Sequence, residues 1–209
     1  MAQLIIPSLL VKSQKELDYF TKRLQNVTKR IHLDVADGKF APNKVLQFSF
    51  KLNKSFHYNA HLMIEHPLPW IKKNFSKIDL FIPHVETLLN PLQYAQWMKK
   101  NHKKIAFAIL PETKVEKIKE YIKVANYILI LTVHPGFYGS KYLPQELKKI
   151  SLIKKINPKV KVIVDGGMNP KTIKNAKKAG ADYFISGSYT TKADNPKKAI
   201  KSLMDAMKK

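Results

Sequence analysis

The chain has 209 residues, of which 44% are hydrophobic and 25% charged, a composition typical of a soluble globular protein. This length suits one domain with a substantial core and is short for two. The absence of cysteine excludes disulfides and thiolate metal sites and agrees with a reducing cytosol. No stretch approaches the roughly 20 apolar residues that cross a bilayer, and the sequence opens without a signal pattern. We therefore expect a cytoplasmic protein with a single domain over residues 1–209.

The formal net charge is +23, from 38 Lys and Arg against 15 Asp and Glu. Such a charge attracts nucleic acid and anionic membranes through its long-range field. The positive residues, however, are nearly all lysines spread along the whole chain, without a basic arm or interleaved aromatic residues. This distribution indicates a lysine-rich surface rather than a nucleic-acid or membrane partner. The same field would help to attract a phosphorylated substrate.

Short apolar runs alternate with amphipathic stretches along the chain. Each run has about five residues rich in Ile, Leu, Val, Phe or Tyr, which is typical of buried parallel strands. The predicted strands cover residues 4–8, 30–34, 58–63, 80–84, 105–110, 127–132, 161–165 and 183–187. Apolar residues at three- and four-residue spacing predict helices over 13–27, 91–101, 114–123, 144–156, 170–178 and 195–209. Ser13 is the expected N-cap of the first helix.

This succession of strands and helices contains no linker, repeat or low-complexity tract. It predicts an α/β fold, a single-domain (β/α)8 TIM barrel. The competing architecture is an open doubly wound sheet, which usually carries a Gly-rich turn after its first strand. No such turn follows Ser8, so the pattern favours the barrel.

Polar residues gather at the carboxyl ends of the predicted strands, where barrel enzymes place their active sites. His32 and Asp34 alternate along one strand and therefore point to the same side. His61 and Asp165 end two other strands. Two imidazoles and two carboxylates suit one divalent metal ion (Zn, Fe(II), Mn or Co). Any one of these residues alone is better explained as a hydrogen-bonded loop anchor, but four on one rim favour a metal site.

Glycines follow three neighbouring strands near the end of the chain and predict a phosphate site. Glycine lets backbone N–H groups approach an anion closely, and barrels often hold phosphate in their last loops. One glycine pair can equally end a strand for steric reasons, whereas three clusters on adjacent loops favour an anion. The candidate residues are Gly136, Phe137, Tyr138, Gly139, Gly166, Gly167, Gly187 and Ser188.

Asp34 and Asp165 come from well-separated strands and could flank a bound substrate on opposite faces. One carboxylate could remove the proton next to a carbonyl while the other returns a proton to the opposite face, which inverts the carbon centre. The alternative is that both carboxylates serve only as metal ligands. Asp37, which precedes Gly38, is interpreted as a turn residue.

At these positions the sequence resembles the ribulose-phosphate 3-epimerase family, in family order and across essentially the whole chain. The matching motifs are PSLL (7–10), HLDVADG (32–38), FAPN (40–43), HLM (61–63), HVE (84–86), LPET (110–113), VHPGF (133–137), VDGG (164–167), GAD (180–182) and GS (187–188).

The resemblance implies a (β/α)8 barrel, one divalent metal ion, a homo-oligomer and the interconversion of D-ribulose 5-phosphate and D-xylulose 5-phosphate in the pentose phosphate pathway. It assigns the metal ligands to His32, Asp34, His61 and Asp165, with the two aspartates as acid and base. It places Ser8 and His61 beside the substrate and the glycine loops on its phosphate.

The sequence departs from the family at Ala36 and Leu131, where methionine is usual, and in the loop over 137–141. These departures leave open an epimerase for a six-carbon ketose phosphate such as D-allulose 6-phosphate. Two alternatives of other kinds are a basic nucleic-acid-binding protein on a barrel scaffold and a metal-independent sugar-phosphate binder.

Overall fold

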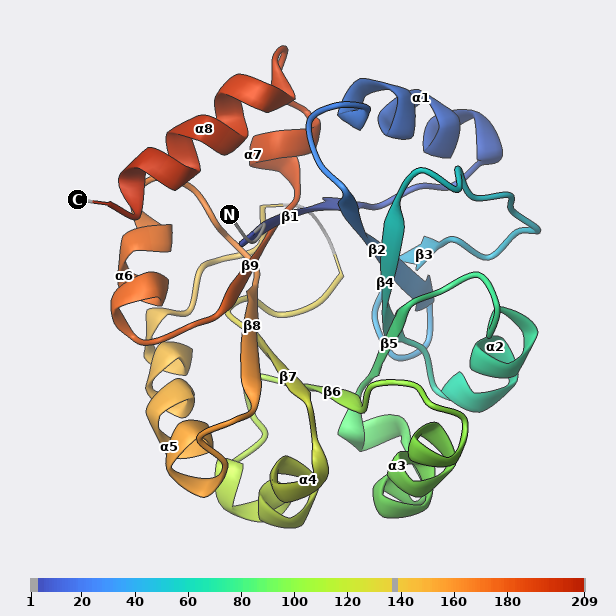
Figure 1. The fold of residues 1–209 in the computed structure, drawn as a ribbon, viewed down its shortest axis with the longest axis vertical. Coiled ribbons are helices and arrows are strands. Elements are labelled where there is room, and N and C mark those ends of the chain that lie inside the picture. Colours follow the sequence, from blue (N-terminus) through green and yellow to red (C-terminus); the bar gives the residue numbers. More distant parts are fainter. Residues whose placement is uncertain (1–3, 137–138, 209) are drawn as a thin grey trace.

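The computed structural model describes residues 4–136 and 139–208, which form a barrel of parallel strands surrounded by helices (Figure 1). The parallel strands are β1 (Ile5–Leu9), β2 (Arg30–Asp37), β4 (His57–Met63), β5 (Leu80–Pro83), β6 (Ala106–Ile109), β7 (Tyr127–Leu131), β8 (Lys161–Asp165) and β9 (Tyr183–Ser186). Their order around the barrel is β5-β4-β2-β1-β9-β8-β7-β6. A parallel bridge between His84 and Ala108 joins the two ends of this order. The predicted barrel is therefore confirmed.

Helices cover the outside of the strands. They are α1 (Gln14–Leu24), α2 (Pro67–Lys73), α3 (Pro91–Lys100), α4 (Lys119–Val124), α5 (Lys148–Ile156), α6 (Thr172–Lys178), α7 (Ser188–Thr191) and α8 (Pro196–Ala206), with 3-10 turns η1 (Val85–Thr87), η2 (Val115–Ile118) and η3 (Pro144–Leu147). As predicted, the Ser13 side chain caps α1, accepting a hydrogen bond from the Glu16 N–H.

Besides the 3-10 turn η1, one strand and two helices lie outside the predicted ranges. Strand β3 (Lys44–Val45) pairs antiparallel with the end of β2, which extends β2 to Asp37, three residues past the predicted end. Helices α2 and α7 have only seven and four residues. Elements this short show too few turns or alternations for a periodic pattern to reveal them.

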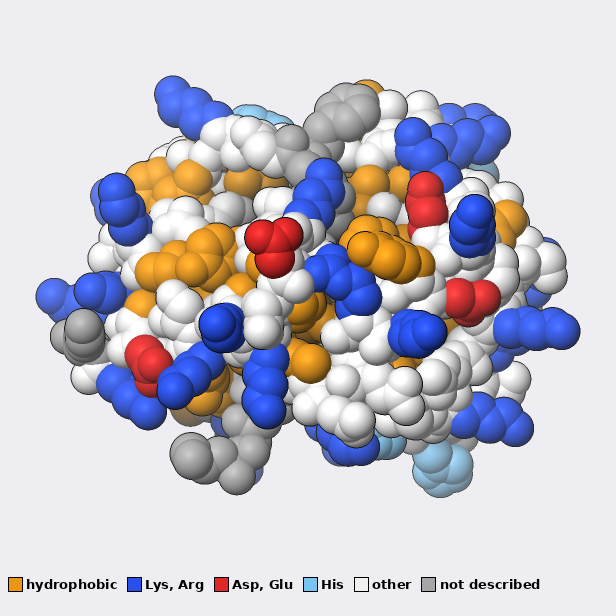
Figure 2. Space-filling model, turned by 90° about the horizontal axis from the view of Figure 1, so that it is seen from above, with side chains coloured by type: hydrophobic (Ala, Val, Ile, Leu, Met, Phe, Trp, Pro, Cys, Tyr) orange, Lys and Arg blue, Asp and Glu red, His pale blue; other side chains and the backbone are white. Residues whose placement is uncertain are grey.

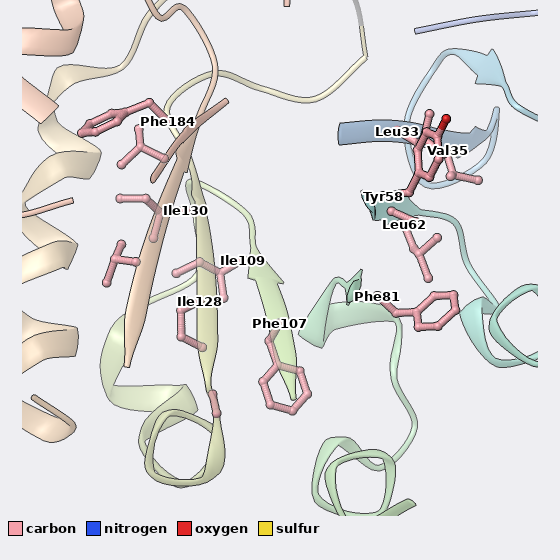
Figure 3. Packing of buried hydrophobic residues seen from close by; sticks show 14 of the residues in the cluster. Leu33, Val35, Tyr58, Leu62, Phe81, Phe107, Ile109, Ile128, Ile130 and Phe184 are labelled. Atoms are coloured by element: carbon pink, nitrogen blue, oxygen red, sulfur yellow. The ribbon is translucent and has the colours of Figure 1, made fainter. Parts of the chain in front are cut away.

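Side chains alternate along each strand between the barrel interior and the helix layer. The outward-facing residues form the larger core, in which Phe81, Phe107 and Phe184 point toward the helices (Figure 3). A second apolar cluster fills the middle of the barrel: Ile6, Leu80, Ile82, Ala106, Ala108, Leu129, Leu131, Ile163 and Ile185. This cluster forms a packed floor, so the polar residues at the carboxyl ends of the strands stand above apolar side chains.

Lysines and arginines are scattered over the face seen in Figure 2, with only a few acidic side chains among them. This view agrees with a charge spread over the surface rather than collected in one stripe. Within the described ranges, no helix is both long enough and apolar enough to cross a membrane.

Candidate active site

Four residues from three strands form a group that could hold a metal ion. They are His32 and Asp34 on β2, His61 on β4 and Asp165 on β8. Each offers one ligand atom, and these atoms all lie within 4.8 Å of one another. Parallel register places Asp34 beside His61, and β1 and β9 separate β2 from β8.

Four nitrogen-to-oxygen distances within this group are close to those between ligands of a single cation. His61 Nδ1 lies 3.6 Å from Asp34 Oδ1 and 3.4 Å from Asp165 Oδ2, and His32 Nε2 lies 3.5 Å and 3.8 Å from the same two atoms. Ligands bound tetrahedrally at about 2.0–2.2 Å are roughly 3.3–3.6 Å apart.

Three of the four imidazole nitrogens of His32 and His61 have no hydrogen-bond partner among the described residues. His32 Nε2 and His61 Nδ1 are buried and without a partner among the described residues. Buried polar atoms rarely stay unpaired, so these nitrogens fit a bound cation. His32 Nδ1 is buried and without a described partner as well.

The electrostatics of the group favour positive charge between the two carboxylates. Burial raises the pKa of Asp34, but the nearby imidazoles of His32 and His61 outweigh burial and lower it below its ordinary value. Burial disfavours a charged His61, but Asp165 and Asp34 outweigh this effect and raise the pKa of His61 to about 9. The group thus stabilises a cation in a buried place, and a divalent metal ion would satisfy the same carboxylates.

Behind His61 lies a second buried histidine. His61 Nε2 is 2.9 Å from His84 Nε2, and His84 Nδ1 is 3.3 Å from Glu86 Oε2. Burial lowers the pKa of His84 to about 4, against the opposing effect of Glu86. Burial would raise the pKa of Glu86, but His84 and hydrogen bonds from Thr113 and Leu110 lower it. His84 is therefore neutral and Glu86 ionised at neutral pH.

A cavity of about 390 Å³ opens above the group at the carboxyl ends of the strands. Asp34, His61 and Asp165 line it, whereas His32 is fully buried beneath. The other predicted substrate residues that line it are Ser8, Gly136, Gly139, Gly166, Gly167, Gly187 and Ser188. Phe137 and Tyr138 lie outside the described residues. The structure therefore brings together every predicted site residue that it describes.

Two glycines on the wall of this cavity are required by close packing. Gly166 has a φ of +111°, and a Cβ there would lie 2.6 Å from Val133 Cγ2. Gly136 has a φ of +142°, and a Cβ would lie 2.9 Å from Pro42 Cγ. Both loops thus bring bare backbone to the cavity.

The profile of the ribulose-phosphate 3-epimerase family matches residues 4–191. The chain belongs to this family. It is accordingly an isomerase, an epimerase acting on a carbohydrate phosphate.

Curated relatives and solved structures agree with the family and the fold. The chain is 30% identical to ribulose-phosphate 3-epimerase from Candida glabrata, over 99% of the chain and 93% of the relative. It is 29% identical to the enzyme of that name from Eremothecium gossypii, over 97% of the chain and 92% of the relative.

Solved barrels with similar folds include 3-hexulose-6-phosphate synthase from Salmonella typhimurium (TM-score 0.67, 12% identity, 98% of both chains). Another is orotidine 5'-monophosphate decarboxylase from Sulfolobus solfataricus (TM-score 0.65, 14% identity, 99% of this chain and 98% of that chain). At these identities the likeness extends to the fold alone.

The structure also locates the two departures from the family pattern. Leu131 lines the cavity. Ala36 belongs to a small apolar cluster beside the cavity, with Ala41, Val45 and Met63. Asp37, predicted as a turn residue, is the last residue of β2 and holds the turn that follows, because its Oδ1 accepts hydrogen bonds from the N–H groups of residues 39 and 40.

Sequence reasoning missed two supporting contacts of the site. His84 and Glu86 were noted only as a motif, although their alternation along the chain repeats that of His32 and Asp34. Asn43 donates a hydrogen bond from Nδ2 to the Gly136 carbonyl at 2.8 Å, across 93 positions of sequence. No local pattern predicts a contact at that separation.

Proposed function

We propose that this enzyme interconverts D-ribulose 5-phosphate and D-xylulose 5-phosphate, a step of the pentose phosphate pathway. The observation that carries the proposal is the buried group His32, Asp34, His61 and Asp165 at the base of a cavity walled by glycine loops. The names of the curated relatives support the choice of reaction.

The four residues of this group would hold one divalent cation (Zn, Fe(II), Mn or Co). Such an ion would polarise the ketone and stabilise the negative charge of an enediolate. The distances among the four ligand atoms and the unpaired nitrogens of His32 and His61 support this assignment.

Asp34 and Asp165 would exchange protons with carbon 3 of the sugar. Both carboxylates line the cavity, and they come from strands separated by β1 and β9. A substrate between them would present one face of carbon 3 to each carboxylate. One aspartate would remove the proton and the other would protonate the opposite face, which inverts the centre without a change in oxidation state.

The phosphate would lie against the glycine loops across the cavity from Asp34. Gly166, Gly167, Gly187 and Ser188 line this wall, and their backbone N–H groups can approach an anion where larger side chains would block it. Ser8, from β1, would lie beside the sugar. Phe137 and Tyr138 stay predictions.

The test follows the proton at carbon 3 in deuterium oxide by NMR. The wild type, supplied with Zn, Mn or Fe(II), is expected to exchange this proton and to form xylulose 5-phosphate. Asp34→Asn and Asp165→Asn should each lower both rates by at least about 100-fold, the usual contribution of a positioned acid or base. Asp205→Asn, which changes an exposed ion pair with Lys208, serves as the control and should match the wild type.

Two outcomes would contradict the proposal. Full exchange in both aspartate variants would remove these residues from the proton transfers. A metal-loaded wild type that is inactive on the pentulose but epimerises D-allulose 6-phosphate would show that the six-carbon sugar is the substrate.

A further inference from the structure

The face of His61 that points away from the carboxylates begins a chain of buried hydrogen bonds. His61 Nε2 meets His84 Nε2 at 2.9 Å, and His84 Nδ1 meets Glu86 Oε2 at 3.3 Å. The second carboxylate oxygen, Glu86 Oε1, accepts from the Leu110 N–H at 3.0 Å and from the Thr113 hydroxyl. This series of hydrogen bonds therefore runs from His61, a candidate metal ligand, to the Glu86 carboxylate, which two donors hold in place.

The carboxylate determines the direction of every hydrogen bond in this chain. Glu86 acts only as an acceptor, so His84 donates to it from Nδ1–H. A neutral imidazole carries one proton, which leaves a lone pair on His84 Nε2. His61 must then donate from Nε2–H, so the neutral form of His61 that would bind a cation carries its lone pair on Nδ1. That atom is the one that faces Asp34 and Asp165.

We propose that Glu86 and His84 are positioning residues that select the His61 tautomer whose Nδ1 lone pair faces the cation, and thereby raise the affinity of the group for a divalent metal ion. This inference rests on the proposed function, because it takes the four-residue group as a cation site. Hydrogen bonds to the far nitrogen of a ligand histidine commonly set its tautomer and orientation.

Packing around His84 holds the hydrogen-bonded side chains of His61, His84 and Glu86 in one arrangement. His84 is fully buried, its ring lies 4.6 Å from the ring of Phe40, and its backbone forms the bridge to Ala108. His32 differs, since its Nδ1 has no partner among the described residues. His61 is therefore the histidine of the group whose proton position is determined by the protein.

Glu86→Gln tests the direction of the chain without changing its shape. The Leu110 N–H can only donate, so the glutamine oxygen would face it and the glutamine NH₂ would face His84 Nδ1. His84 would then carry its proton on Nε2, and His61 would have to accept on Nε2 and protonate Nδ1. The variant thus keeps the hydrogen bond from the Leu110 N–H, but it places the proton of His61 on Nδ1, the atom that faces the cation.

The experiment measures the affinity for zinc ions alone, by competition with a chromophoric chelator. Glu86→Gln is expected to bind zinc about 10- to 100-fold more weakly than the wild type, the usual loss on removing such a partner. Glu120→Gln, which removes an exposed carboxylate on α4, serves as the control and should stay within about threefold of the wild type.

A second readout observes the protons directly. Nitrogen-15 NMR of the zinc-loaded wild type should place the proton of His84 on Nδ1 and that of His61 on Nε2. This measurement does not depend on any variant folding, and a purely structural role for Glu86 would not require this arrangement.

The failures of the two proposals are distinguishable. A wild type that binds no zinc, manganese or iron overturns the metal site and this inference together. A wild type that binds one equivalent of zinc, with unchanged affinity in a folded Glu86→Gln variant or with His84 protonated on Nε2, overturns this inference alone.

Discussion

Gly166, directly after the candidate ligand Asp165, gives a stability prediction whose size follows from distances. A Cβ at this position would lie 2.6 Å and 2.9 Å from the two methyl carbons of Val133 and 3.1 Å from its N atom, whereas ordinary contact begins at 3.4 Å. Rotating Val133 cannot relieve all three contacts. The loop cannot retreat easily either, because Thr132 donates hydrogen bonds to the carbonyls of Asp165 and Gly166 at 2.7 Å and 2.6 Å.

Gly166→Ala therefore combines two costs. Overpacking costs about 1–3 kcal/mol, and a left-handed backbone costs an alanine about 1–2 kcal/mol more. The expected loss in the free energy of unfolding is about 2–5 kcal/mol, the sum of these two terms. Gly180→Ala is the matched control, because Gly180 has a φ of +98° but its Cβ would meet only Ile150 Cγ2, at 3.7 Å.

The assay is thermal unfolding of both metal-free variants, followed by circular dichroism. Gly180→Ala should lower the free energy of unfolding by the backbone cost alone. The two variants should then differ by about 1–3 kcal/mol, or by about 2–12 °C in Tm for a chain of this size. Equal losses in the two variants would refute the argument, because the contact with Val133 would then contribute nothing.

Three further predictions concern other parts of the molecule. Burial would raise the pKa of Asp182, but hydrogen bonds from Lys154, the Val162 N–H and Lys161 outweigh it and lower this pKa. Its contribution is thus present above the unfolded pKa and lost as the pH falls through the folded pKa. In urea unfolding, Asp182→Asn should cost about 1–2 kcal/mol at pH 7 and progressively less as the pH falls below the unfolded pKa, and a pH-independent loss would contradict this. Phe107→Ala, in the core of Figure 3, should lower the free energy of urea unfolding by about 3–5 kcal/mol, and a loss below about 1 kcal/mol would mean that this site collapses. Asn43→Ala frees the Gly136 carbonyl and should raise KM for the sugar phosphate several-fold at constant kcat in steady-state assays, so an unchanged KM would show that this loop needs no tether.

The sequence revealed the barrel because buried parallel strands appear as short apolar runs. The predicted strands over 127–132 and 161–165 match β7 and β8 to within one residue. It could not reveal β3, where one of two residues, Lys44, is exposed and the pairing depends on β2. Short elements of this kind form because tertiary neighbours hold them, so their residues carry little local preference.

The candidate metal group was accessible from sequence because His32 and Asp34 alternate on one strand and parallel strands share a common rim. The roles of His84 and Glu86 were not, because the same alternation fits a ligand and a partner of a ligand equally well. Only the distance of 2.9 Å between His61 Nε2 and His84 Nε2 separates the two roles. The homo-oligomer that the resemblance implies stays a prediction.

The closure of the barrel between β5 and β6 has a dynamic consequence. These strands meet through the bridge between His84 and Ala108, and the Glu86 carboxylate supplements it by accepting from the Leu110 N–H. A seam with so few backbone hydrogen bonds is where local opening should begin, and native-state hydrogen exchange of the β6 amides should be faster than that of the β7 amides. Each opening would also release the Glu86 carboxylate, the partner of His84, from the Leu110 N–H. We therefore expect a bound cation to be released during the same slow local opening of the seam between β5 and β6.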